Sequence, residues 1–342
     1  MQFRNFSIAI VLSSLVVSTT SAQLFRSTSK VGTTAAQFLK IGASARALGM
    51  GSAYVAMPGD VYSAYWNPAG LSRFERTAEV TFNHAEWLAD VKYDYAAGMI
   101  TLGEVGTVAA SLISMRVPED IVRTVEFPEG DGRHWDANSL ALGLSYARNL
   151  TDRFSIGFNF KFISENVWNE SAQGVALDFG TLYITPFHDL KIGASISNFG
   201  TKMQLKGQDS YFNWSPAPVG GPQNIPSEYR LGEYDLPLMF RIGVAMDLYR
   251  GEMFRATAAV DATHPNDNTE YVNSGVELSY REVIFARAGY KSLFLRDSEQ
   301  SLTWGVGVRY DIVNSMAVKF DYAYADYGRL KNIQYFNLSL VF

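Results

Sequence analysis

The sequence has no cysteine and few charged residues. Of its 342 residues, 18% are Asp, Glu, Lys or Arg, against roughly 25% in an average globular chain. Without cysteine the chain forms no disulfide and carries no lipid anchor on a cysteine, although this says little about its redox compartment. The formal net charge of −5 argues against nucleic acid as a partner. The low charge implies either a large core or a surface that faces something other than water.

Long apolar runs are missing except near the N-terminus. There, Arg4 precedes an apolar run over residues 6–17, and the small residues Thr20, Ser21 and Ala22 come before Gln23. This pattern is typical of a secretory signal peptide, predicted over residues 1–22. The alternative is a buried helix or a membrane anchor, but the run is shorter than the roughly 20 residues that span a bilayer. We expect an exported protein that could enter a membrane only as a barrel.

Alternation of apolar and polar residues dominates from about residue 78 to the end. Residues 154–162 place four phenylalanines and one isoleucine on one face, opposite Ser, Gly, Asn and Lys. The same period of two recurs in residues 238–248, 302–311 and 318–324. Short turns alternate with longer links, above all residues 118–136 and 200–235, and divide the region into about fourteen strands.

Alternation alone does not say whether the apolar face points inward or outward. A soluble β-sandwich has shorter strands and no asymmetry between turns and loops, whereas outer-membrane barrels have short periplasmic turns and long extracellular loops. We therefore predict an all-β fold, a 14-stranded antiparallel transmembrane β-barrel over residues 78–342, in the outer membrane of a diderm bacterium. Its apolar face would contact outer-membrane lipid. Its lumen would be lined by charged residues: Lys161, Asp178, Arg241, Asp247, Arg255, Asp261, Glu277, Arg287, Arg309, Asp311, Lys319 and Asp321.

Residues 23–77 do not share the period of two. About fifty residues of this kind cannot build a core alone, so we expect them inside the barrel or across one mouth, where polar groups of the lumen satisfy their backbone. Arg46 is the only charged residue between Lys40 and Asp60. It is expected to pair with an inward carboxylate, such as one of Asp178, Asp247 and Asp321.

One stretch of this region resembles a known family. Residues 38–56, with Asp60 and the sequence Tyr-Trp-Asn-Pro-Ala-Gly-Leu over residues 65–71, are similar to the N-terminal signature of the PorV/PorQ family, which is grouped with FadL-type outer-membrane transporters. The resemblance implies that residues 23–77 form an N-terminal hatch, or plug, in the lumen. The motif residues either hold this hatch in place or contact a ligand or partner directly: Gly42, Arg46, Gly49, Gly51, Asp60, Trp66, Asn67, Pro68 and Gly70.

The chain ends on a strand with an apolar face. Phe336, Leu338, Leu340 and Phe342 alternate with polar residues, and such an edge must be paired and covered. We expect these four side chains to face lipid on the strand that closes the barrel. Resemblance to other outer-membrane proteins implies that they also form a C-terminal assembly signal that ends in Phe342.

Sites for catalysis, metals or cofactors are not evident. The four histidines, His84, His134, His188 and His264, are scattered and lack metal-ligand spacing. Gly49-Met50-Gly51 lacks the context of a nucleotide-binding loop, and no nucleophile elbow occurs. We therefore predict no cofactor, no metal and no enzyme activity.

The longest links supply candidate contact residues for a protein partner. Aromatic side chains lie there among Pro and Gly, a mixture that suits protein recognition, although they could instead pack onto the barrel rim: Trp135, Tyr211, Phe212, Trp214 and Tyr229. Resemblance to PorV implies a role in type IX protein secretion, by binding cargo signal domains or secretion components. The alternatives are a FadL-like channel that takes up hydrophobic small molecules, and a structural envelope scaffold.

Overall fold

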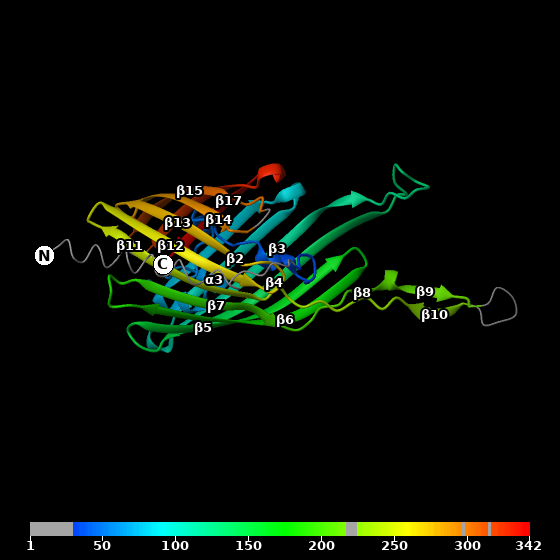
Figure 1. Cartoon of the computed structure of the whole chain (residues 1–342), viewed down its shortest axis with the longest axis horizontal. Coiled ribbons are helices and arrows are strands. Elements are labelled where there is room, and N and C mark those ends of the chain that lie inside the picture. The colour runs from blue at the N-terminus through cyan, green and yellow to red at the C-terminus, as the bar shows by residue number, and fades with distance from the viewer. Residues whose placement is uncertain (1–29, 217–223, 296–297, 314–315) are drawn as a thin grey trace, which may run out of the picture.

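Fourteen antiparallel strands form a closed ring in the computed structural model, which describes residues 30–216, 224–295, 298–313 and 316–342. The proposed signal peptide, residues 1–22, lies outside these ranges. The predicted fourteen-stranded barrel is confirmed (Figure 1). Its strands are β1 (Ala78–Glu86), β2 (Lys92–Thr101), β3 (Thr107–Ile121), β4 (His134–Asn149), β5 (Phe154–Val167), β6 (Glu170–Ile184), β7 (Lys191–Gly200), β11 (Met239–Arg250), β12 (Phe254–Pro265), β13 (Tyr271–Tyr280), β14 (Ile284–Leu293), β15 (Leu302–Val313), β16 (Met316–Asp326) and β17 (Asn332–Val341).

The ring closes between the last strand and the first. Strand β17 pairs with β16 on one side and with β1 on the other, in a register that sets Val341 opposite Glu79. The terminal residue extends this seam, because the backbone N–H of Phe342 donates to the carbonyl of Ala78. Its own carbonyl accepts from the N–H groups of Thr77 and Ala78. The seam therefore leaves no unpaired edge on either strand.

The two ends of the barrel differ in their connections. One end carries tight turns, such as η4 (Gly103–Val105) between β2 and β3, together with the C-terminus. The other carries η3 (Leu88–Asp90), η6 (Gly328–Leu330) and the long links over residues 122–133 and 201–238. Because outer-membrane barrels have their short turns in the periplasm, the first end is periplasmic and the second is extracellular.

The longest extracellular link contains a hairpin of its own. Strands β9 (Tyr211–Trp214) and β10 (Ile225–Glu228) form a separate two-stranded sheet, preceded by η5 (Gln208–Ser210) and by β8 (Lys206–Gly207), which pairs with β6. Figure 1 shows this hairpin projecting beyond the ring, at the end opposite to the C-terminus. It therefore lies on the extracellular side of the ring.

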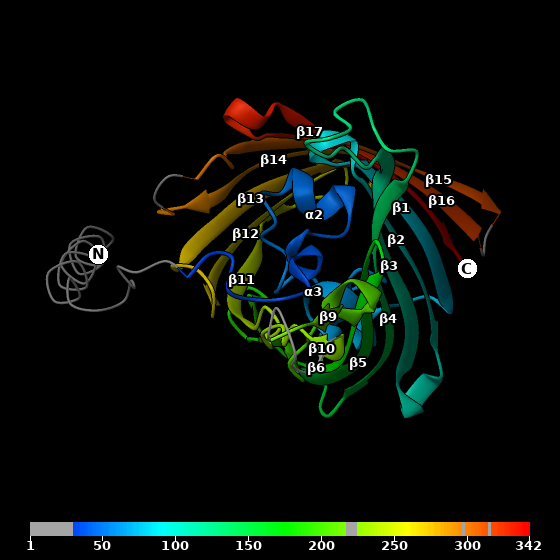
Figure 2. The same ribbon diagram turned by 90° about the vertical axis from the view of Figure 1, so that its right-hand side faces the viewer.

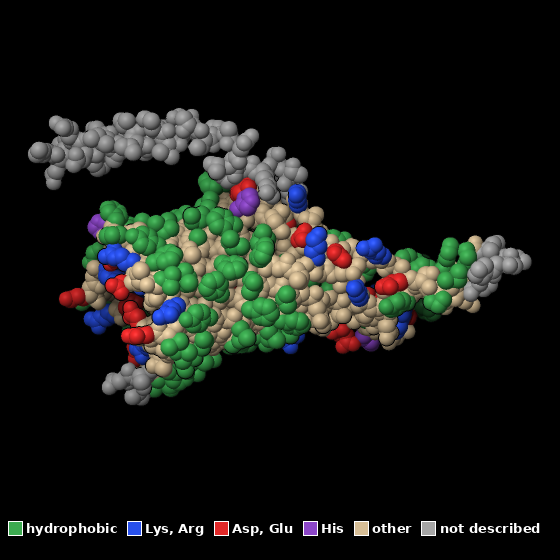
Figure 3. All heavy atoms as spheres, turned by 90° about the horizontal axis from the view of Figure 1, so that it is seen from below, with side chains coloured by type: hydrophobic (Ala, Val, Ile, Leu, Met, Phe, Trp, Pro, Cys, Tyr) green, Lys and Arg blue, Asp and Glu red, His purple; other side chains and the backbone are tan. Residues whose placement is uncertain are grey.

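Apolar side chains cover the outside of the ring. Figure 3 shows them spread over the broad part of the molecule, whereas charged side chains gather at its two ends. The terminal strand follows the prediction, because Phe336, Leu338, Leu340 and Phe342 all lie on the outer face and are 36–49% exposed. These side chains would contact lipid in the outer membrane.

Residues 30–77, called here the N-terminal segment, lie inside the ring (Figure 2). Their helices are short: η1 (Gln37–Lys40), α2 (Ala45–Gly49), α3 (Ser63–Trp66) and η2 (Pro68–Arg73). At the extracellular end, the hydroxyl of Thr34 donates to Asp267 in the β12–β13 link. At the periplasmic end, Arg73 donates to Ser155 at the start of β5. The segment thus runs the length of the lumen before β1 begins.

Among the helices that the structure describes, none is long and apolar enough to cross a membrane.

Deletion of Phe342 should lower the amount of folded barrel in the outer membrane. The deletion removes both the last backbone pairing of the seam and the aromatic end of the chain, whereas Phe342→Ala removes only the side chain. We expect the deletion to lower the yield more than Phe342→Ala does, as measured by heat-modifiable mobility on gels of isolated outer membranes. Normal yield for both variants would contradict a role for the chain end in assembly.

Candidate functional site

The N-terminal segment packs against glycines of the barrel wall. A Cβ atom at Gly275 or Gly289 would overlap the backbone of Met50 and Gly51, and one at Gly193 would overlap the carbonyl of Val55. Glycine within a strand often marks a place where another backbone approaches closely. The glycines on the inner face of the wall are therefore contact points for the segment. The alternation assigned these glycines to the polar face but did not predict that they contact the segment. Their recurrence on that face is the signal that could have indicated it.

The Asn-Pro element docks in the same way. Asn67 caps η2 by accepting from the N–H of Ala69 at 3.2 Å, and its amide donates to the carbonyls of Val55 and Thr181 at 2.8 and 3.0 Å. Pro68 occupies the first helical position, where its missing N–H costs nothing. Opposite this element, Gly157 on β5 and Gly180 on β6 leave room for the chain; a Cβ at either would overlap it. Asn67 is therefore a structural link between two parts of the segment and the wall.

A chain of buried charges joins the segment to the wall. Arg46 on α2 binds Glu277 of β13 with two hydrogen bonds of 2.8 Å. Glu277 also accepts from Arg287 of β14 at 2.7 Å, and Arg287 in turn donates to Asp321 of β16 at 2.7 Å. The side chains of Glu277, Arg287 and Asp321 are almost fully buried. Buried charges persist when they are paired and hydrogen-bonded, so this chain fixes α2 against three strands.

Arg46 pairs with an inward carboxylate as expected, but this carboxylate is Glu277, and the three examples named for it were wrong. Asp178 pairs with Lys161, Asp247 pairs with Arg250, and Asp321 reaches Arg46 only through Arg287 and Glu277. The second carboxylate on Arg46 is Asp60 of the segment itself, at 3.1 Å. The hydroxyl of Tyr54 also donates to Asp60, and burial holds the pKa of this hydroxyl well above its ordinary value, so that it stays protonated.

The remaining motif residues also contact the segment itself or the wall. Trp66 donates from its indole to the carbonyl of Ala43 at 2.9 Å, and Gly42 lies against the ring of Trp66. Gly49 lies against Gly305 of β15, and Gly70 lies against Ser63. The structure therefore brings all nine motif residues into one packed unit, and whether any of them contacts a partner stays a prediction.

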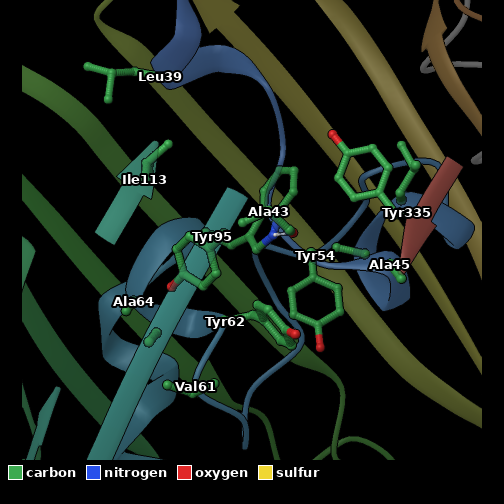
Figure 4. Close-up of a cluster of buried hydrophobic side chains, with 14 of the residues drawn as sticks. Leu39, Ala43, Ala45, Tyr54, Val61, Tyr62, Ala64, Tyr95, Ile113 and Tyr335 are labelled. Carbon is green, nitrogen blue, oxygen red and sulfur yellow. Dashed lines mark hydrogen bonds between the residues drawn. The ribbon is translucent and has the colours of Figure 1, made fainter. Parts of the chain in front are cut away.

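Tyrosines from the segment and from the wall form a buried cluster between them. Figure 4 shows Tyr54 and Tyr62 of the segment near Tyr95 of β2 and Tyr335 of β17. The rings of Tyr62 and Tyr95 lie 5.8 Å apart. Aromatic pairs at this distance add to the hydrophobic stabilisation of a buried contact. The lumen is thus filled by aromatic packing as well as by ion pairs between side chains.

Arg241 and Lys291, two buried cations of the lumen, differ from Lys161 and Lys40. Lys161 binds Asp178 at 2.9 Å, and Lys40 binds Asp267 at 2.8 Å. By contrast, Arg241 and Lys291 are only 4% and 8% exposed, yet within the described ranges neither has a carboxylate within 4 Å. Arg241 donates to Ser197 and lies over the ring of Trp66; Lys291 contacts Tyr327. Removal of such a charge should cost less than removal of a paired one.

The loop candidates lie apart from this packed unit. Trp135 is half-buried on the extracellular part of β4, opposite Asp120 of β3. Tyr211 and Trp214 on β9 are 64% and 53% exposed, and Tyr229 is 61% exposed. Tyr229 stacks on Phe212 with ring centroids 4.4 Å apart. The hairpin therefore presents aromatic surface to solvent, held in shape by one stacked pair.

Within the described ranges, no group of three or more His, Asp or Glu side chains is arranged to hold a metal ion. His84 lies 2.7 Å from Asp94, and His264 lies 2.8 Å from Glu270. Each of these histidines thus pairs with a single carboxylate.

A family model for the type IX secretion system protein PorV matches residues 25–213, more than half of the chain. The chain belongs to the PorV family. The resemblance of residues 38–71 to this family is thereby confirmed, as is the location in the outer membrane. A comparison with curated proteins gave no match.

Solved structures of the same fold are FadL-type barrels. A Pseudomonas aeruginosa FadL homologue covers 88% of this chain and 98% of its own, with 13% identity and a TM-score of 0.57. The Ralstonia pickettii toluene transporter TbuX covers 87% and 97%, with 12% identity and a TM-score of 0.54. The Pseudomonas putida toluene transporter TodX covers the same shares, with 10% identity and a TM-score of 0.54. At this identity the likeness shows a shared fold. Family and fold are those of transport or secretion barrels, which are not known enzymes.

Gly180→Ala should loosen the N-terminal segment. The new methyl group would overlap Asn67, and overpacking of this kind costs about 1–3 kcal/mol. We expect faster proteolysis of the segment in the purified barrel and a lower unfolding temperature. Gly98→Ala on β2 is the control, because its Cβ would meet nothing nearer than Val80 at 3.7 Å. Equal protection in the two variants would contradict docking of Asn67 at this glycine.

Neutralising Lys161 and neutralising Lys291 should affect stability differently. Lys161→Met leaves Asp178 buried without its partner, at a cost of about 3–5 kcal/mol, whereas Lys291→Met removes a charge that no carboxylate compensates. We expect the first variant to unfold at lower urea concentration than the unaltered barrel, and the second at the same or higher concentration. Urea unfolding in lipid vesicles, followed by tryptophan fluorescence, measures both. A large loss of stability for Lys291→Met would show that this charge has a stabilising partner.

Proposed function

We propose that the protein acts in type IX secretion by binding a protein partner at its extracellular end. The observation that carries the proposal is the projecting β9–β10 hairpin with exposed Tyr211, Trp214 and Tyr229. Tyrosine and tryptophan are enriched where proteins bind each other, because they bury much area at little conformational cost. The partner would be the signal domain of a secreted cargo or a component of the secretion apparatus.

The content of the lumen supports protein contact over solute passage. A channel for hydrophobic molecules needs a continuous apolar pocket. Here the N-terminal segment runs through the ring, and a cavity of about 200 Å³ beside it is lined mainly by charged groups, among them Arg46, Asp60, Glu79 and Arg287. Such a lining disfavours an apolar solute. The segment would then serve as a hatch that seals the barrel while loops do the binding.

A second candidate function is uptake of a hydrophobic small molecule. The buried aromatic cluster around Tyr62 and Tyr95 favours it, because a movement of the segment, which carries Tyr62, would expose apolar ring surface in the lumen (Figure 4). For this function the segment must move to open a path past Asn67. Lipid or detergent bound in a dry pocket beside Asn67 would support uptake instead of secretion.

Replacing the hairpin aromatics should separate these functions. For Tyr211→Ser with Trp214→Ser, we expect at least about a tenfold lower yield of secretion components or cargo co-purified from native outer membranes, because interface aromatics often contribute 2 kcal/mol or more. Export of cargo should fall in parallel. The control is Phe187→Ser, an equally exposed aromatic at the periplasmic end.

The level of folded barrel should be the same in both variants. If no secretion component accompanies even the unaltered barrel, and export survives its deletion, the secretion proposal fails. Retention of other envelope proteins alone would point to a scaffold.

A further inference from the structure

The periplasmic mouth of the lumen is lined by cationic side chains from many elements. A cavity of about 460 Å³ opens there, and one acidic side chain, Glu75, lines it. Eight cationic side chains line the same cavity: Arg46, Arg73, Arg76, Lys191, Arg250, Arg255, Arg309 and Lys319. They come from the N-terminal segment and from β7, β11, β12, β15 and β16. This cavity is called here the basic vestibule.

The carboxylates near the vestibule do not match these cations one for one. Asp311 is shared by Arg76 and Arg309, at 3.4 and 3.0 Å. Asp247 is shared by Arg250 and Arg255, at 2.5 and 3.8 Å, although Arg255 also binds Glu282 at 2.7 Å. The deeper cations, in contrast, bind buried carboxylates: Arg46 binds Glu277, and Lys319 binds Glu79. The shortage of negative charge is therefore greatest at the open end.

Two cations of the vestibule have no carboxylate partner. In the described part of the chain, neither Arg73 nor Lys191 lies within 4 Å of a carboxylate oxygen. Arg73 donates to the hydroxyl of Ser155 and to the carbonyl of Asp152, which orient it without neutralising it. Both side chains are half-buried, so their charges are screened less than those of exposed groups. Such positions favour an anion that enters the vestibule.

We propose that the basic vestibule binds an acidic segment of a periplasmic protein. The cations belong to inward-facing positions and to the N-terminal segment, so the cavity opens within the ring and lipid headgroups outside the ring do not reach it. Several guanidinium groups spread around one cavity suit several carboxylates, each held by paired hydrogen bonds. A single small anion would contact only a few of these groups at once. The barrel would then have a second protein-binding site, at the end opposite to the hairpin and independent of it.

The test uses the full barrel in nanodiscs of phosphatidylcholine and a short fluorescein-labelled polyglutamate peptide. We expect saturable binding by fluorescence anisotropy that weakens steeply as salt rises. Arg73→Gln with Lys191→Gln should weaken binding at least about tenfold, whereas Arg153→Gln, an exposed arginine at the same end that does not line the vestibule, should leave it unchanged. Lys191→Gln alone provides a milder variant if the double variant folds poorly.

Three results would overturn the proposal. Equal affinity in the Arg153→Gln and Arg73→Gln/Lys191→Gln proteins would show that the peptide binds elsewhere. Displacement of the peptide by inorganic phosphate at equal concentration would indicate a site for small anions only. Absence of peptide binding, together with retention of phosphatidylglycerol that the double variant loses, would indicate a lipid site.

Discussion

The position of the N-terminal segment depends on the carboxylate of Glu277. This one group accepts hydrogen bonds from Arg46 of the segment and from Arg287 of the wall, and it is about 1% exposed. A third guanidinium, that of Arg255, lies 3.4 Å from it. Removing a guanidinium partner from a buried carboxylate is strongly destabilising. The segment is thus held in two ways. Its backbone packs against glycines of the wall, and its Arg46 pairs with Glu277, a carboxylate of the wall. Loss of Arg46 from this site would leave Glu277 of the wall with less compensating positive charge. The segment and the barrel therefore stabilise each other.

Much of the barrel could be predicted from the sequence, because alternation directly reports which side chains share a face. The inward positions of Lys161, Arg241 and Glu277 and the outward positions of the terminal strand followed from the alternation once the apolar face was assigned to lipid. The alternation does not give the position of a residue along the barrel axis, because this position depends on strand tilt and stagger. For this reason the partners expected for Arg46 were on the correct face of the wall, but Asp178 and Asp247 bind other cations.

The segment itself was harder to foresee. Its short helices, such as α2 with five residues, have no periodic pattern, and their conformation is set by contacts with strands far away in the sequence. Asn67 illustrates this, since its capping role could be expected from the following proline, whereas its bond to Thr181 required the fold. The wall glycines were visible in the sequence as small residues on the polar face. Their purpose becomes clear only when Pro68 and Met50 lie against them.

The seam between β17 and β1 has a consequence for the order of events during biogenesis. Phe342 bonds to Thr77 and Ala78, where the N-terminal segment turns into the first strand. A chain that spans the lumen from Thr34 to Arg73 is enclosed on all sides once this seam has formed. The segment must therefore enter the lumen before the ring closes or while it closes. Closure of the ring and enclosure of the segment thus depend on the same seam, so a barrel that stays open there would also leave its interior open.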